Sequence, residues 1–162
     1  MLIRLCKVFM LLSLSFFAFL VTFSNITDYD SNYQFVRHVL SMDTTFPNNA
    51  AMYRAITTEW VWNAAYWLII FGEGLTCIFL LIGGLSLLGA IRLPANEFNA
   101  RKTMAVLGCT AGFAVWFLGF MAIGGEWFLM WQSETWNGQE AAFRFYVSIL
   151  GVLVFVMLPE PE

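Results

Sequence analysis

The chain has 162 residues, of which 60% are apolar and only 12% are charged, and its mean hydropathy is +0.72. Soluble domains carry about 25% charged residues, so this composition excludes a water-soluble enzyme or binding domain. The net charge of −3, without a basic stripe, excludes nucleic acid as a partner. The composition predicts a small integral membrane protein with the lipid bilayer as its solvent.

Four apolar segments predict four membrane-spanning helices, because a helix needs about 20 apolar residues to cross a bilayer. These spans cover approximately residues 3–24, 60–91, 102–125 and 139–158. The first resembles a signal peptide, but no small-residue cleavage site follows it, so we expect a retained span. The fold predicted for residues 1–162 is a single all-α domain, an up-and-down bundle of four transmembrane helices.

Two polar stretches, 25–59 and 126–138, predict the loops on one side of the bundle. Apolar residues recur at helical spacing in the first, which predicts a short amphipathic helix at about 31–42. Ser31 and Gln34 have the spacing of a capping box at its start.

The basic residues predict the orientation, because segments rich in Lys and Arg stay in the cytoplasm. Arg37, Arg54 and Arg144 lie on the side of the two loops. The side of the termini carries more, namely Arg4, Lys7, Arg92, Arg101 and Lys102. Both termini are therefore predicted to be cytoplasmic, and the two loops are predicted to face the periplasm or the exterior.

Glu73 is the only charged residue inside the second apolar run. A charged group near the centre of a span costs about 2.5–3.5 kcal/mol on insertion scales and normally faces protein or a water-filled cavity. Helical spacing puts one stripe toward the rest of the bundle, formed by Tyr66, Glu73, Thr76, Cys77 and Gly84. Two interpretations of Glu73 remain, a proton or cation site and a packing residue.

Rows of small residues predict which faces of the later spans pack inward. On the third span Gly108 and Gly112 form a GxxxG motif, and the helical spacing continues this row through Gly119 to Glu126. On the fourth span a row begins at Arg144 and continues through Ser148 and Gly151. We expect the small-residue rows of spans two, three and four to face the interior.

Arg144 has three candidate partners. It lies about 8 Å below the outer end of its helix, whereas Glu73 lies roughly 18 Å below the end of its own, so Glu126 or Glu140 matches its depth better. The predicted buried polar cluster consists of Glu73, Tyr66, Arg144, Glu126 and Glu140.

Aromatic residues mark the outer boundary. Trp127, Trp131 and Trp136 are typical of an interfacial belt, and the alternative is a docking surface for a partner that also includes His38. His38 is the only histidine, so a bis-His haem or a His-based metal site within this chain is excluded. We predict no cofactor, no metal site and no catalytic residue, since no recognised enzyme motif is present.

Three stretches resemble a bacterial family known only as predicted small integral membrane proteins of unknown function (DUF2165). They are NITDYDSNYQFVRHVLSMDTTF, AAYWLIIFGEGLT and FMAIGGEWFLMWQSETWNGQEAAFRF. The resemblance implies four spans in a bacterial inner membrane and implies no activity.

Three functional hypotheses follow. The first is a non-enzymatic accessory or interaction subunit of a larger membrane complex, bound to other subunits or to copies of itself. The second is a small proton- or solute-coupled carrier that uses Glu73. The third is a membrane-embedded enzyme acting on lipid or quinone at the outer rim, with Glu126, Glu134, Glu140 and His38 as acids and bases.

Overall fold

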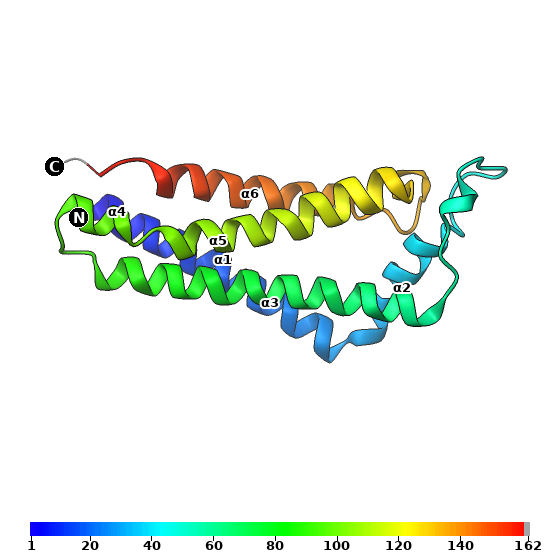
Figure 1. The fold of residues 1–162 in the computed structure, drawn as a ribbon, viewed down its shortest axis with the longest axis horizontal. Coiled ribbons are helices and arrows are strands. Elements are labelled where there is room, and N and C mark those ends of the chain that lie inside the picture. The colour runs from blue at the N-terminus through cyan, green and yellow to red at the C-terminus, as the bar shows by residue number, and fades with distance from the viewer. Residues whose placement is uncertain (161–162) are drawn as a thin grey trace.

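The computed structural model describes residues 1–160 as an elongated bundle of helices (Figure 1). The long elements are α1 (Leu2–Thr27), α2 (Tyr29–Ser41), α3 (Glu59–Gly89), α5 (Thr103–Phe113), the π-helical η2 (Ala114–Trp127) and α6 (Gln139–Met157). The short ones are α4 (Ala95–Ala100) and the 3-10 helices η1 (Met52–Arg54) and η3 (Met130–Gln132). Residues 1–160 form no strand. The predicted all-α bundle with four helices long and apolar enough to cross a membrane is confirmed, with α4, α5 and η2 joined in one of them.

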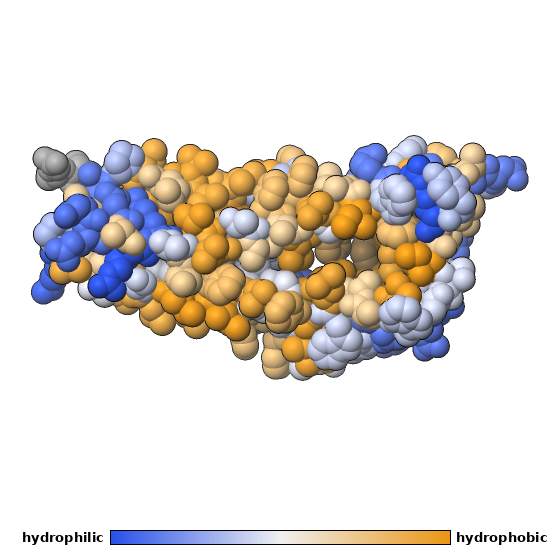
Figure 2. All heavy atoms as spheres, in the orientation of Figure 1, coloured by the Kyte–Doolittle hydropathy of each residue, from blue (hydrophilic) through white to orange (hydrophobic). Residues whose placement is uncertain are grey.

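The bundle has two different ends (Figure 1). Both termini lie at one end together with α4, which we call the terminal end. The opposite end, which we call the loop end, holds α2 and residues 42–58 and 128–138. Hydrophilic residues gather at both ends and a broad apolar band separates them (Figure 2), as expected of a protein that crosses a bilayer.

Helix α3 packs against both α1 and α5. Its glycines allow α5 to approach closely, because a Cβ atom on Gly83 would lie 2.6 Å from the backbone nitrogen of Ala105. Gly108 of α5 is equally close, since its Cβ would lie 2.8 Å from the backbone nitrogen of Leu80. The small-residue rows of the second span and of the first half of the third therefore face inward, as predicted.

The row predicted on the fourth span faces the other way. Arg144 and Ser148 are exposed, and no atom lies within 4 Å of a Cβ built on Gly151. The buried face of α6 instead carries Ala142, Ile149, Val152 and Val156. At about 100° per residue these apolar side chains lie opposite Arg144, so burying them turns the predicted row outward.

The row predicted on the third span ends where the helix changes its winding. Gly119 is half-buried and Glu126 is exposed, although Gly112 in the same predicted row is buried. In η2 the backbone hydrogen bonds run from residue i to residue i+5, so each residue turns through a smaller angle than in an α-helix. The α-helical spacing therefore predicts the wrong face beyond Phe113.

The amphipathic helix predicted at about 31–42 is present as α2 (Tyr29–Ser41). Only Asp28 separates it from α1, so the chain turns sharply here. The predicted capping box is wrong, because α2 starts two residues before Ser31, whose hydroxyl donates to Asp28 Oδ1 at 2.9 Å.

Candidate functional site

Glu73 lies in the middle of α3 with 2% of its surface exposed. Its Oε2 accepts a hydrogen bond from Asn25 Nδ2 at 2.7 Å, and Asn25 Oδ1 in turn accepts one from Asn32 Nδ2 at 2.7 Å. The Tyr66 hydroxyl donates to the backbone carbonyl of Asn25 at 3.0 Å. We call Glu73, Asn25, Asn32 and Tyr66 the Glu73 cluster.

The positions of these residues follow from the helices. Tyr66 and Glu73 are seven residues apart on α3, two turns along one face, as the sequence predicts. Asn25 lies in the last turn of α1, which ends beside the middle of α3, and the sharp turn at Asp28 brings Asn32 back beside it. Neither asparagine belongs to the predicted cluster, because the polar sequence around Asn25 predicts an outer loop there. One argument from the sequence could have found them: a buried carboxyl group requires a hydrogen-bond donor at the same depth in the membrane.

A chain of aromatic and polar contacts continues from the cluster toward the loop end. The Tyr29 ring lies 4.7 Å from the Tyr66 ring, centroid to centroid, and its hydroxyl donates to Asn63 Oδ1 at 2.9 Å. These contacts attach the start of α2 to α3, at Tyr66 and about one turn nearer the loop end, at Asn63.

A cavity of about 230 Å³ lies beside the Glu73 cluster, and all four cluster residues line it. The remaining wall is mostly aromatic and apolar, and includes Val21, Phe35, Ile69, Trp116, Phe120 and Phe145. Within residues 1–160, no group donates a hydrogen bond to Glu73 Oε1, since the bond from Asn25 goes to Oε2. One oxygen of a buried carboxyl group is therefore available to a molecule in the cavity.

A second, apolar cavity of about 160 Å³ adjoins the first and opens between α2, α3 and η2. The two cavities share Phe35, Val36, Ile69 and Phe120 in their walls. Figure 2 shows this face of the molecule hollowed between α3 and η2, within the apolar band. The opening therefore leads from the lipid-facing surface toward the Glu73 cluster.

The opening depends on the local structure of η2. Gly119 and Gly124 line it, and neither has a side chain to fill the space between η2 and α3. A Cβ on Gly119 would meet only the carbonyl oxygen of Ala114, at 3.8 Å. Gly119 thus leaves room that a larger residue would occupy.

The other charged residues predicted for the buried cluster lie elsewhere. Arg144 forms an ion pair with Glu140, and their side chains remain 68% and 81% exposed. Glu126 is exposed at the end of η2. The expectation of a buried cluster therefore does not hold for these three residues. Arg144 reaches a carboxylate one turn away on its own helix, on the face that α6 turns away from the bundle.

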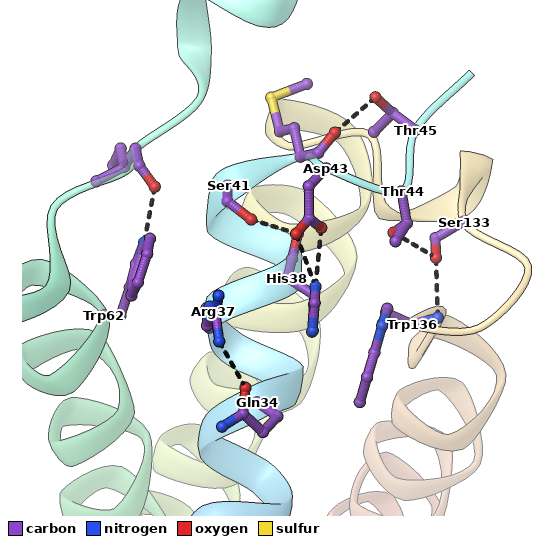
Figure 3. A network of polar contacts seen from close by, with 12 residues as sticks. Gln34, Arg37, His38, Ser41, Asp43, Thr44, Thr45, Trp62, Ser133 and Trp136 are labelled. Carbon is purple, nitrogen blue, oxygen red and sulfur yellow. Dashed lines mark hydrogen bonds and ion pairs between the residues drawn. The ribbon is translucent and has the colours of Figure 1, made fainter. Parts of the chain in front are cut away.

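At the loop end, α2 contacts the segment 128–138 through a polar network (Figure 3). The His38 ring stacks on the Trp136 ring at 4.7 Å, and its Nδ1 lies 2.8 Å from Asp43 Oδ2. Ser133 Oγ accepts hydrogen bonds from the Thr44 hydroxyl at 2.8 Å and from the Trp136 backbone N–H at 2.9 Å. The cavity beside His38 has about 10 Å³, which is no larger than a single water molecule needs.

The two remaining predicted tryptophans are half exposed, Trp127 by 53% and Trp131 by 46%. The Arg54 guanidinium lies 4.7 Å from the centre of the Trp127 ring and donates to the Trp127 carbonyl at 3.2 Å. Together with Trp136 they border the loop end, as a belt or a docking surface would require.

The terminal end is held by a second polar group. Lys7 is 1% exposed, and its Nζ donates to the Leu158 carbonyl and to Glu160 Oε1, both at 2.6 Å. Arg4 Nε donates to Glu160 Oε2 at 3.2 Å, and Lys102 Nζ donates to the Leu158 carbonyl at 3.1 Å. Burial raises the pKa of the Glu160 carboxyl group, but its hydrogen bonds and charge interactions with Lys7 and Arg4 outweigh burial and hold its pKa below the ordinary value.

The model of a family described as predicted small integral membrane proteins (DUF2165) matches residues 3–159. The chain belongs to this family. The match covers the four long apolar helices, the Glu73 cluster and the opening beside it. No curated protein and no solved structure matches the chain.

Membership in this family agrees with the fold. Its description as integral membrane proteins and the four long apolar helices together place the chain in a lipid bilayer. The Glu73 cluster is therefore a polar site within the membrane part of the protein.

Proposed function

We propose that the protein is a non-enzymatic accessory subunit of a larger membrane complex. The observation that carries this proposal is the exposed row on α6 formed by Glu140, Arg144, Ser148 and Gly151, which we call the α6 row. Charged residues within membrane spans nearly always face protein or a water-filled cavity. The bundle leaves this row uncovered, so a second membrane protein is the partner that would cover it.

The depth and shape of the α6 row support contact with another helix. Ser148 lies about 13 Å along α6 from its first residue, well inside the apolar band. Gly151 has no neighbour within 4 Å of a built Cβ, and such a residue lets another helix approach closely.

A matched pair of variants tests this role. On a native gel of membranes solubilised in mild detergent, we expect the wild-type chain in an assembly with other proteins. Gly151→Leu should release it as a monomer, whereas Gly89→Leu, at an equally open position of α3, should not. Migration of the wild-type chain alone at monomer size in several mild detergents contradicts the proposal, and an assembly of identical chains indicates a homo-oligomer instead.

We further propose a location in a bacterial inner membrane with both termini in the cytoplasm. The terminal end carries more of the basic residues than the loop end, and this imbalance supports the orientation. A fluorescent protein that matures only in the cytoplasm, fused to the C-terminus, should be bright. A dark fusion, together with an active alkaline phosphatase fusion at the same position, would reverse the orientation.

A small proton- or solute-coupled carrier is the second candidate, favoured by the cavity beside Glu73. A carrier must also open toward the terminal end, where Leu80 and Leu87 are fully buried. In vesicles with a pH-sensitive dye, proton flux through the wild-type chain that is lost in Glu73→Gln would favour this candidate. Equal flux in the wild type and Glu73→Gln would eliminate it.

A further inference from the structure

We propose that the cavity beside Glu73 binds a cationic single-chain amphiphile, a long-chain ammonium compound that enters from the membrane between α3 and η2. The ammonium group would pair with the Glu73 carboxylate, and the alkyl chain would occupy the apolar opening. This proposal is independent of the subunit contact through the α6 row.

Charge selects the head group. Glu73 carries the only carboxyl group among the residues that line the two cavities, and none of these residues is Lys, Arg or His. A carboxylate removed from water needs a cation or additional donors, and the hydrogen bond from Asn25 satisfies only Oε2. A primary ammonium group supplies a positive charge and three N–H donors, of which one can donate to Oε1. A phosphate or carboxylate head group would instead place a second negative charge beside the first.

The walls of the inner cavity also suit an ammonium group. Trp116, Phe120 and Phe145 line it, and the faces of aromatic rings attract cations. The volume of about 230 Å³ is ample for a head group, because a cavity of about 150 Å³ already holds benzene.

The apolar opening suits an alkyl chain that enters from the lipid. Its lining contains no charged residue, and Leu68 and Ile123 at its border are 70% and 46% exposed on the apolar band. The two cavities share four wall residues and therefore adjoin, so we place the alkyl chain in the outer cavity and the ammonium group in the inner one.

Photolabelling tests the proposal on the full chain in detergent micelles. The probe is hexadecylamine with a diazirine in the middle of its chain, and the matched probes are the corresponding alcohol and carboxylic acid. We expect the amine to label peptides of α3 and η2 at the opening, and excess unlabelled hexadecylamine to compete. Labelling by the alcohol should be weaker, and labelling by the acid at this position should be absent.

Two variants examine the two halves of the site. Glu73→Gln should reduce amine labelling at the opening about tenfold, whereas Glu126→Gln, which alters an exposed carboxylate, should not. Gly119→Leu should block the opening, whereas Gly89→Leu, also a helical glycine with open space, should leave labelling intact. Equal labelling by amine and acid overturns the proposal, as does undiminished amine labelling of Glu73→Gln. If Glu73→Gln does not fold, undiminished labelling of Gly119→Leu overturns it.

Discussion

Replacing Asn25 by Ala tests whether the Glu73 cluster holds α1, α2 and α3 together. The change removes the donor to Glu73 Oε2 and the acceptor for Asn32 Nδ2, each at 2.7 Å. Leaving a buried polar group unpaired costs about 1–3 kcal/mol, and more where the group is charged. We therefore expect Asn25→Ala to lower the free energy of unfolding by about 2–4 kcal/mol.

A double-mutant cycle separates the cluster from general packing. Each single change leaves the other residue of the Asn25–Glu73 hydrogen bond without its partner. Asn25→Ala combined with Glu73→Leu removes both residues of this bond, so the double variant should be more stable than the sum of the single changes predicts. We expect a coupling energy of about 1.5–3 kcal/mol. Thr22→Ala is the control on the same helix, because the Thr22 hydroxyl donates only to the Ala18 carbonyl of α1 itself.

The measurement is reversible unfolding in mixed micelles, titrated with a denaturing detergent and followed by tryptophan fluorescence. The control variant should remain within about 1 kcal/mol of the wild type. Strict additivity of the two changes, or an Asn25→Ala variant as stable as the control, would refute the assignment of Asn25 as the partner of Glu73.

Three further predictions concern packing, pH and the loop end. Gly83→Ala should lower the free energy of unfolding by about 1–3 kcal/mol in the same assay, because the added Cβ would meet the backbone of α5. Gly89→Ala, where no atom is near, should not lower it, and equal effects of the two changes would contradict this packing. Because the pKa of Glu160 is lowered in the folded state, its contribution to stability is complete above the ordinary glutamate value and is lost as the pH falls below that value and through the lowered pKa. Glu160→Gln should remove this acid-side loss from the pH profile of stability, and an unchanged profile would exclude the assignment. Ser133→Ala should accelerate hydrogen exchange in residues 42–58 and 128–138 while leaving α3 unchanged, which mass spectrometry of peptides would detect.

Much of the architecture was predictable from the sequence. The mean hydropathy of about 20 consecutive residues indicates whether a segment lies in lipid or in water. The sequence alone therefore determined the number of long apolar helices. The inward position of Glu73 was also determined, because the cost of a charge in lipid allows few alternatives. Tyr66 followed from Glu73 through the helical repeat alone.

Only the tertiary structure decided which side chains meet. Lipid is as apolar as the interior of the bundle, so hydropathy does not distinguish the buried face of α6 from its lipid-facing one, and the predicted row turned outward. The α-helical spacing ends at Phe113, after which the π-helical η2 begins. The hydropathy pattern did not predict this change of winding. The pairing of Asn25 with Glu73 depends on where α1 ends along α3, which is a relation between helices. The cavity beside Glu73 depends on the same tertiary packing, because residues of α1, α2, α3, η2 and α6 all line it.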